Sequence, residues 1–306
     1  MIDVVVIGSL NMDLVIQTPR FPAAGETIQG GDLATYPGGK GANQAVAASK
    51  QGLNVAMIGM AGKDQFGSRL LETLKEQGVD VQGISQHASA ATGTALILVD
   101  QDGENVIVLS PGANAKLAPE DIDQHLSLLG KSKYLLMQFE IPLETVMHAA
   151  VTAHKMGVTV ILNPAPGRDI PRQLLETVDI LVPNESELGI ISNQPVRNLP
   201  EAKSAARSLV DGPLSAVVVT LGGQGAYLVT GQEEMHVKAP EIEVVDTTAA
   251  GDSFIGGLLS GLGRGETLPE AVKYANCAGA LATTKPGAQP SLPTLEEVQR
   301  LYQEGQ

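Results

Sequence analysis

The segment from Val244 to Gly257, VVDTTAAGDSFIGG, places one carboxylate, that of Asp252, in a turn of small residues at the expected start of a helix. Small residues let a phosphate approach the backbone, and the first N–H groups of a helix carry a partial positive charge. Such a site can bind an anionic group during its transfer, while Asp252 removes a proton from the hydroxyl that accepts the group. An Asp here is also typical of a simple helix cap, so position alone leaves both interpretations open. We expect the helix to begin at Gly251 or Asp252.

A second glycine-rich segment, YPGGKGAN, ends at Asn43 and leads into a helical stretch at 44–49. It does not satisfy the Walker A pattern, because Gly41 rather than Ser or Thr follows Lys40. One interpretation is a turn followed by a capped helix. The other is a site where bare backbone and the amide of Asn43 hydrogen-bond a polyol.

Three further polar segments each follow a run that is typical of a buried strand. They are NMD at 11–13, NESE at 184–187 and TLGGQG at 220–225. Each is a weak signal alone, since glycine-rich turns and acidic helix starts are common. Ligands bind at the carboxyl ends of the strands in open α/β sheets, so we expect the three segments to meet at one edge.

The elements that must position these residues alternate between strand and helix. Strand-like runs are expected at 4–7, 54–60, 134–137, 158–162, 180–182 and 216–220. Helical stretches are expected at 41–51, 65–77, 143–156, 170–177, 185–191, 200–209, 253–262, 268–284 and 295–303. The strand runs are continuously apolar, which indicates strands buried on both faces. The sequence therefore predicts an α/β fold, with a central, mostly parallel sheet and helices on both faces.

Two regions, at about 13–36 and 94–109, break this alternation with short strand-like pieces. Asp102-Gly103 lies between two such pieces and is a strong hairpin signal. We expect a small β-sheet lid that projects from the main sheet, whose apolar face needs a cover, either the active site or a second subunit. We find no internal repeat, so residues 1–306 are expected to form a single domain.

The composition argues against several classes of protein. Twenty basic and 34 acidic residues give a net charge of −14, which disfavours nucleic acid and anionic membranes as partners. No apolar run reaches the roughly 20 residues needed to span a bilayer, and a cytoplasmic protein is expected. Cys277 is the only cysteine, which excludes an internal disulfide. No G-x-G-x-x-G follows the first strand, which argues against a nicotinamide dehydrogenase.

From Ile7 to about Ser291 the chain resembles the ribokinase-like family of carbohydrate kinases, and the segments GGKGANQAVAA and DTTAAGDSF are specific in combination. The resemblance implies transfer of the γ-phosphoryl group of ATP to the 5-hydroxyl of D-ribose, giving ribose 5-phosphate and ADP. Deoxyribose, fructose or a related sugar, or a nucleoside, remains an alternative acceptor; few aromatic residues (3%) argue against a nucleoside. A non-catalytic binding protein on the same fold is a further alternative, and the presence of Asp252 argues against it.

The resemblance also implies roles for residues that match the family's motifs. Asp252 would be the catalytic base, beside an anion hole formed by the amides of Ala249, Ala250 and Gly251. The sugar would be held by Asn11, Asp13, Gly39, Lys40, Asn43, Glu140 and Asp252. ATP would lie against Asn184, Thr220, Gly222, Gly223, Gly225, Gly251 and Asn276. Two departures are visible: Ala250 stands where many relatives have Gly, and Phe139 where Leu is more usual.

Metal ions and a partner subunit are implied in the same way. Asn184 and Glu187 would organise Mg²⁺ and the phosphates, through water. A monovalent cation such as K⁺ would be bound, partly through backbone carbonyls, by Asp246, Thr248, Ala282, Lys285, Gly287 and Ser291. The lid would pair with its copy in a homodimer, and the remaining partners would be the small-molecule sugar and ATP.

Overall fold

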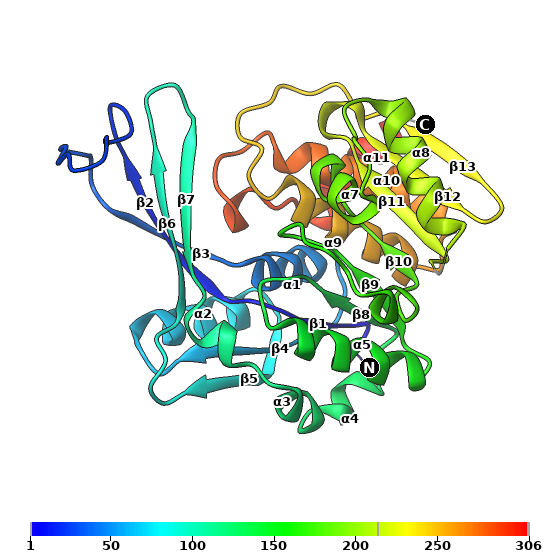
Figure 1. The fold of residues 1–306 in the computed structure, drawn as a ribbon, viewed down its shortest axis with the longest axis horizontal. Coiled ribbons are helices and arrows are strands. Elements are labelled where there is room, and N and C mark those ends of the chain that lie inside the picture. The colour runs from blue at the N-terminus through cyan, green and yellow to red at the C-terminus, as the bar shows by residue number, and fades with distance from the viewer. Residues whose placement is uncertain (1, 213, 305–306) are drawn as a thin grey trace.

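The computed structural model describes residues 2–212 and 214–304, and these form a nine-stranded sheet and a separate four-stranded sheet (Figure 1). In the large sheet the strands from β11 to β5 run parallel, and β12 and β13 extend one edge as an antiparallel hairpin. The order across the sheet is β13 (Glu234–Val237), β12 (Ala226–Thr230), β11 (Ala216–Thr220), β10 (Ile180–Leu181), β9 (Thr159–Leu162), β8 (Tyr134–Met137), β1 (Val4–Ile7), β4 (Val55–Gly62) and β5 (Asp80–His87). The predicted mostly parallel α/β sheet is confirmed.

Both faces of the large sheet are covered by helices. One face packs against α3 (Pro119–Asp123), α4 (Leu126–Leu129), α5 (Leu143–Lys155), α6 (Arg172–Leu175), α7 (Glu185–Ser192) and α8 (Leu199–Val210). The other packs against α1 (Lys40–Lys50), α2 (Gln65–Glu76), α9 (Ala250–Gly263) and α10 (Leu268–Ala282), and α11 (Leu295–Glu304) packs on α10. Short 3₁₀ turns are η1 (Gly112–Lys116), η2 (Gly222–Gln224) and η3 (Gln289–Ser291). Within 2–212 and 214–304, no helix is both long and apolar enough to cross a membrane.

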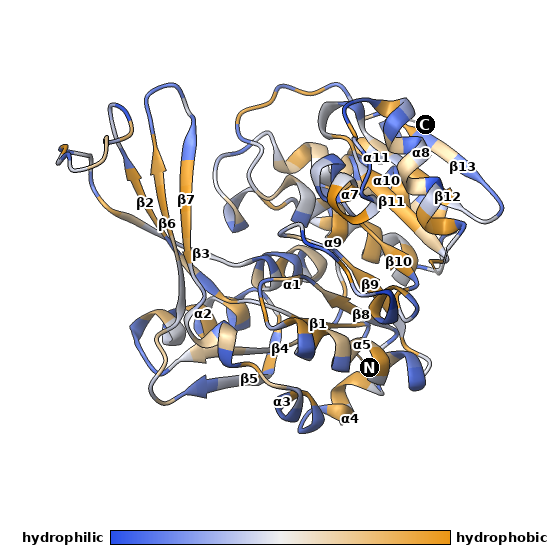
Figure 2. Cartoon of the chain, in the orientation of Figure 1, coloured by the Kyte–Doolittle hydropathy of each residue, from blue (hydrophilic) through white to orange (hydrophobic). Residues whose placement is uncertain are grey.

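The central strand β1 shows why its residues are continuously apolar. Val5 and Ile7 belong to the core on one face of the sheet, whereas Val4 and Val6 belong to the core on the other. All four side chains are fully buried, because successive residues of a strand point to opposite faces. Figure 2 shows the same apolar colouring along the inner strands of the large sheet. Each such side chain stabilises the fold by about 1.5–3 kcal/mol through burial.

The four-stranded sheet, which we call the lid, projects from the body of the molecule (Figure 1). Its order is β3 (Ala34–Gly38), β2 (Asn11–Gln17), β6 (Gly93–Val99) and β7 (Asn105–Ser110). The expected hairpin joins β6 to β7: Gly103 has φ 79°, and Asp100 N–H donates to the carbonyl of Glu104 at 3.0 Å. The lid strands extend beyond the expected regions of about 13–36 and 94–109, since the first begins at Asn11 and the last ends at Ser110.

The boundaries of several elements differ from those expected. The helix expected at 170–177 is reduced to α6, Arg172–Leu175, because Pro171 lies in extended conformation directly before it. Helix α9 begins at Ala250, one residue early, after Ala249 adopts the left-handed conformation at φ 58°. The edge strands β5 and β13, and β12 next to β13, were not expected; β5 carries polar residues such as Gln82 on the sheet's exposed edge.

Candidate active site

The site lies where the strand order reverses. Strand β1 is flanked by β4 and β8, and the chain builds the sheet outward from β1 first on one side and then on the other. Such a switch point leaves a crevice at the carboxyl ends of the two central strands. Ser9 and Asn11 follow β1 there, Glu140 follows β8, and α1 begins at Lys40.

Glu140 is held by donors from two of these segments. Its Oε2 accepts hydrogen bonds from Ser9 Oγ at 2.5 Å, from the backbone N–H of Lys40 at 3.1 Å and from Asn11 Nδ2 at 3.4 Å. No described residue donates to its other oxygen, Oε1. The carboxylate is thus fixed by one oxygen and can accept from a ligand with the other.

Asn11 is oriented by a residue that the sequence did not indicate, Asn114. Asn114 is fully buried, and its Oδ1 accepts from the N–H of Leu10 at 2.9 Å while its Nδ2 donates to the Leu10 carbonyl at 3.0 Å. The same Nδ2 donates to Asn11 Oδ1 at 2.8 Å. Because that oxygen is occupied, Asn11 presents its Nδ2 donor to Glu140 and to the crevice.

Asp13 lies on β2, opposite Tyr36 and Ala95 on the neighbouring lid strands. Gly38 is required beside it, because a Cβ at that position would lie 2.2 Å from Asp13 Oδ2. Burial, with the nearby charges of Glu140 and Asp252, raises the pKa of Asp13 to about 7. The lid therefore contributes one carboxyl group to the crevice.

Asp252 lies in the first turn of α9 and is fixed by two amides of α1. Its Oδ1 accepts from Gln44 Nε2 at 2.9 Å and its Oδ2 from Asn43 Nδ2 at 3.3 Å. Burial raises the pKa of Asp252 above its ordinary value, and the charge of Lys40 and the two amide donors act in the opposite direction. Asp252 is thus more than a helix cap, because its carboxylate bonds another helix rather than its own backbone.

The backbone before Asp252 offers fewer open amides than the sequence suggested. The N–H of Ala250 donates to the carbonyl of Thr247 at 3.2 Å, which occupies one of the three expected anion-hole groups. The first helical bond of α9 is made by Ser253, which donates to Ala249 at 2.8 Å. Among the described residues the Gly251 N–H has no hydrogen-bond acceptor, and Gly251 lines a cavity. The Gly251 amide at the helix N-terminus is therefore open to a ligand.

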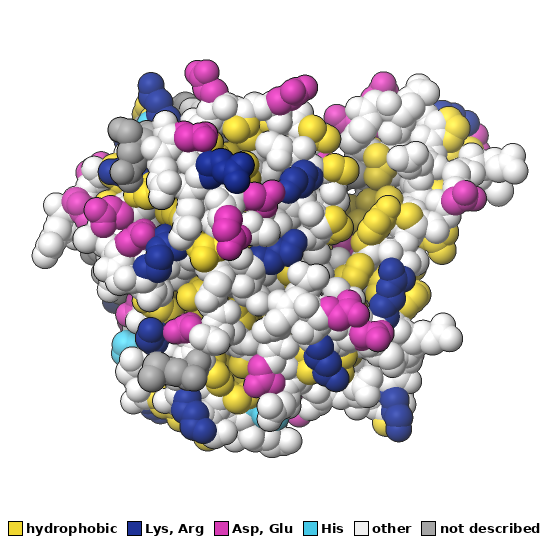
Figure 3. Space-filling model, turned by 180° about the vertical axis from the view of Figure 1, so that it is seen from behind, with side chains coloured by type: hydrophobic (Ala, Val, Ile, Leu, Met, Phe, Trp, Pro, Cys, Tyr) yellow, Lys and Arg dark blue, Asp and Glu magenta, His cyan; other side chains and the backbone are white. Residues whose placement is uncertain are grey.

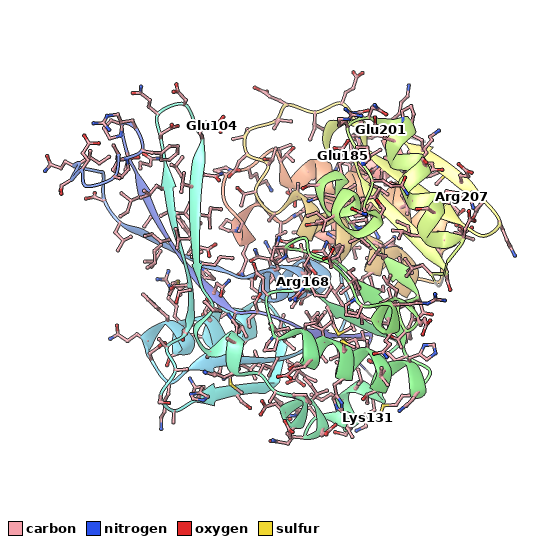
Figure 4. All side chains as sticks on the ribbon, viewed as in Figure 1. Glu104, Lys131, Arg168, Glu185, Glu201 and Arg207 are labelled. Atoms are coloured by element: carbon pink, nitrogen blue, oxygen red, sulfur yellow. The ribbon has the colours of Figure 1, made fainter. Side chains whose placement is uncertain are left out.

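A cavity of about 630 Å³ adjoins this helix start. Every residue expected at the ATP site lines it: Asn184, Thr220, Gly222, Gly223, Gly225, Gly251 and Asn276. Apolar side chains such as Ile242, Val244 and Phe254 supply walls suited to a flat ring system. Glu185, labelled in Figure 4 at the start of α7, borders the same cavity.

Asn184 and Glu187 form a capping box at the start of α7. Asn184 Oδ1 accepts from the N–H of Glu187 at 2.8 Å, and Glu187 Oε2 accepts from the N–H of Asn184 at 2.9 Å. Glu187 is buried, which raises its pKa, and the charges of Lys40 and Asp252 act on it too. Among the described residues no group of three His, Cys, Asp or Glu side chains could hold a metal. The pair is compatible with a Mg²⁺ ion whose ligands are mostly water molecules and phosphate oxygens.

The residues expected around a monovalent cation come from two loops that Asp246 joins. Its Oδ1 accepts from the N–H and the hydroxyl of Thr248 at 2.8 and 2.6 Å, and its Oδ2 from the N–H of Gly287 at 2.8 Å. The side chain of Lys285 donates to Glu297 at 2.8 Å and is therefore not directed to Asp246. The other expected residues, Ala282 and Ser291, are buried. The loops can supply carbonyl oxygens, the ligands a monovalent cation prefers.

A second cavity, of about 350 Å³, lies on the lid side of the crevice. It is lined by Asn11 and Glu140, by Asn114, and by Leu109 and Ser110 at the end of β7. Behind Glu140, Phe139 is buried and packs against the guanidinium of Arg168, whose Cζ lies 5.7 Å from the ring centre. Figure 3, which views the molecule from behind, shows apolar side chains gathered beside the lid on the right.

A carboxylate beside an open helix N-terminus, with cavities nearby in the same α/β fold, is an arrangement suited to the transfer of a phosphoryl group. Residues 1–295 match the sequence model of the pfkB family carbohydrate kinases. The chain belongs to that family and is a carbohydrate kinase.

Individual relatives agree with this. The chain is 39% identical over 292 residues to a ribokinase of Haemophilus influenzae, with 95% of each chain covered. It is 38% identical to a deoxyribokinase of Salmonella typhi, with 96% of this chain and 97% of the other covered. It is also similar to the structure of Arabidopsis thaliana ribokinase complexed with ribose and ATP, with a TM-score of 0.92, 32% identity and 99% of each chain covered.

Proposed function

We propose that this kinase transfers the γ-phosphoryl group of ATP to the 5-hydroxyl of D-ribose, giving ribose 5-phosphate and ADP. One observation carries the proposal: Asp252 lies between the 630 Å³ cavity, which Gly251 lines, and the polar crevice, to which Asn43 of α1 ties it. A group that must touch both a sugar hydroxyl and a phosphate has to lie at such a junction.

The sugar is held by side chains of opposite hydrogen-bonding character. Asn11 donates through Nδ2, whereas Glu140 accepts through its free Oε1. Asp13, Asn43 and the backbone at Gly39 and Lys40 complete the set. Because a sugar hydroxyl both donates and accepts, paired donors and acceptors fix its orientation as well as its position.

In the chemical step, Asp252 takes the proton of the 5-hydroxyl as the sugar oxygen attacks the γ-phosphorus. The bond from that phosphorus to the oxygen bridging it to the β-phosphate breaks, and ADP leaves with the electron pair. The Gly251 amide and the positive end of α9 stabilise the negative charge on the transferring group. Ala249, in left-handed conformation, turns the chain directly before α9, so that the Gly251 amide faces the transferring phosphoryl group.

Two metal ions complete the proposed site. Mg²⁺, organised through water by Asn184 and Glu187, would neutralise charge on the phosphates of ATP. A monovalent cation such as K⁺, bound by the loops that carry Asp246 and Gly287, would add positive charge near the α9 N-terminus. The Asp246 bonds to both loops hold the carbonyls in place for it.

The whole chain is proposed to act as one catalytic domain, with the lid covering the sugar. Asp13 and Leu109 lie in one cross-strand row of the lid, through Ala95, and so share the face turned to the crevice. The opposite face carries Leu96 and Val108, which pair across β6 and β7 and are 43% and 62% exposed. A second copy of the chain is proposed to cover that face in a homodimer.

The base assignment is tested by Asp252→Asn. We expect ATP binding and the far-UV circular dichroism spectrum to be retained, and kcat to fall by about 10²- to 10⁴-fold, the usual contribution of a general base. Asp211→Asn, at the exposed end of α8, is the matched control and should keep normal turnover. Near-normal kcat in Asp252→Asn would refute the assignment.

Deoxyribose is a second candidate acceptor, because a deoxyribokinase is as similar to the chain as the ribokinases are. Coupled measurement of ADP release across ribose, deoxyribose, fructose and adenosine, with and without K⁺, separates the candidates. We expect the highest kcat/KM with ribose. If deoxyribose or adenosine is turned over faster, that compound rather than ribose is the substrate, and the proposed chemical step is unchanged.

A further inference from the structure

Three side-chain amides, those of Gln44, Gln138 and Asn163, form a connected network that ends on Asp252. Gln44 and Gln138 are completely buried, and Asn163 is partly buried. Gln44 comes from α1, Gln138 follows β8 and Asn163 follows β9. Buried amides destabilise a core unless they are hydrogen-bonded, so the network calls for an explanation.

The direction of every bond in the network is fixed by one backbone carbonyl. Asn163 Nδ2 donates to the carbonyl of Val182 at 2.9 Å, which can only accept, so Asn163 Oδ1 is turned to Gln44. Gln138 Nε2 donates to Gln44 Oε1 at 2.6 Å. Gln44 Nε2 therefore has to be the donor to Asn163 Oδ1 and to Asp252 Oδ1, each at 2.9 Å.

The network is not optimised for stability alone. Gln138 Oε1 is buried and has no hydrogen-bond partner among the described residues, which costs free energy. An apolar side chain at Gln138 would remove that cost but would leave the buried Oε1 of Gln44 without a donor. Gln138 therefore holds the far side of the Gln44 amide, while Asn163 and Asp252 accept from its nitrogen.

We propose that Gln44 is a positioning residue for phosphoryl transfer, held by Gln138 and Asn163 so that its amide fixes Asp252 Oδ1 and directs Oδ2, which also accepts a longer bond from Asn43, toward the acceptor hydroxyl. The inference rests on the proposed function, because it takes Asp252 as the base. It assigns a role to Gln44, the residue that follows Asn43 in α1, and to two residues at the ends of neighbouring strands.

The pH dependence of kcat reports the hydrogen bond from Gln44 Nε2 to Asp252 Oδ1. A hydrogen bond from Gln44 favours the ionised carboxylate of Asp252, against the burial that raises its pKa. The charged groups that act on Asp252 from neighbouring elements are Lys40 on α1, Glu140 after β8, Asp13 on β2 and Glu187 on α7. Substitution of Gln44 leaves all four in place.

The test is the acid limb of kcat for Gln44→Met, with ribose and ATP both saturating so that ionisation of Asp13 in the free protein does not contribute. Loss of one hydrogen bond to a charged group should move the limb up by about one pH unit. Gln51→Met is the matched control: Gln51 is also buried at the end of α1, but it bonds the Pro293 carbonyl and Tyr274. Its limb should stay at the wild-type pH, and a wild-type limb in Gln44→Met would overturn the proposal.

A second variant keeps the test decisive if Gln44→Met does not fold, as judged by circular dichroism. Gln138→Met leaves Gln44 Oε1 without a donor and so loosens the side chain that binds Asp252 Oδ1; its acid limb should also rise, and an unchanged limb there overturns the proposal. Asp252→Asn separates the two levels of inference. If that variant keeps its turnover, the base assignment itself fails. If it is inactive while the Gln44 and Gln138 variants keep the wild-type limb, only the positioning role fails.

Discussion

At the scale of single residues, the crevice concentrates acidic groups that would repel one another in the absence of sugar. Burial, with the charges of Glu140 and Asp252, raises the pKa of Asp13, whereas the charge of Lys40 opposes the rise that burial causes in the pKa of Asp252. Removing such charges from water is unfavourable, and the site tolerates it because ligand hydroxyls and phosphates use these groups. Asp13 shows the effect most clearly, because its pKa is raised to about 7.

We predict that kcat/KM for ribose falls as the pH is lowered below about 7, by up to about tenfold per unit, as Asp13 becomes protonated and loses its charge-assisted bond to the sugar. The measurement is kcat/KM from pH 5.5 to 8.5 at saturating ATP. Asp13→Asn should show low kcat/KM and no limb near 7. If the limb persists in that variant, another group is responsible.

The same group links stability to pH. The folded pKa of Asp13 lies above its ordinary value, so its ionisation destabilises the fold increasingly as the pH rises from 3.8 to about 7. Asp13→Asn should therefore have a higher Tm than the wild type at pH 8, and the difference should shrink as the pH is lowered to 4. Calorimetry of the sugar-free protein measures both.

At the scale of elements, Asp64 joins the helix α2 to the base of the lid. Its Oδ1 accepts from the N–H of Gly67 at 2.8 Å, which caps α2, and from the hydroxyl of Thr92 at 2.6 Å. Its Oδ2 accepts from the N–H of Thr92 at 2.8 Å, directly before β6. Burial opposes the ionisation of Asp64, but these hydrogen bonds outweigh it and lower the pKa.

Asp64→Ala should reduce the free energy of unfolding by about 2–3 kcal/mol, because it removes a helix cap and leaves the N–H of Thr92 unpaired. Urea unfolding at pH 7 measures the loss. The contribution is present above the ordinary pKa of 3.8 and is lost as the pH falls below it, so the two proteins should converge in acid. Asp80→Ala, which removes only exposed bonds to Gln82, is the control and should cost much less.

Elements differ in how far the sequence predicts them. The buried strands, such as Val4–Ile7, were predicted because strands covered on both faces are continuously apolar. The edge strand Asp80–His87 lacks that pattern, since one edge of it meets water. The start of α9 depends on the left-handed conformation of Ala249, which an alanine does not announce in a sequence.

The site shows the same division. Asn11 and Asn184 were singled out in the sequence because they come after strand-like runs, and the resemblance to carbohydrate kinases implied their roles. Ser9 and Asn163 also follow strands and could have been found by the same rule. Gln44 and Asn114 could not, because the partners that give them a role lie far away in the chain: Gln44 to Asp252 spans 208 positions and Asn114 to Leu10 spans 104.

At the scale of the whole molecule, the lid leaves apolar side chains uncovered in a chain with a net charge of −14. We predict a dimer in sedimentation velocity experiments, and a monomer for Val108→Glu, because burying a carboxylate in an apolar interface is strongly unfavourable. Met156→Glu, equally apolar and 43% exposed at the end of α5, is the control and should remain dimeric. A wild-type monomer would refute the proposed dimer, and a dimeric Val108→Glu would place its interface elsewhere.

Two of the lid strands, β2 and β3, and several of the proposed sugar ligands belong to one continuous stretch of chain. Strand β2 begins at Asn11, and β3 ends at Gly38, immediately before Gly39 and Lys40. A sugar bound to both Asn11 and Glu140 would therefore act directly on the residues at which the lid strands begin and end. A water molecule would contact only some of the groups that a sugar contacts. We therefore expect the lid to close with sugar bound and not with ATP alone, so that idle hydrolysis of ATP stays slow until the acceptor arrives.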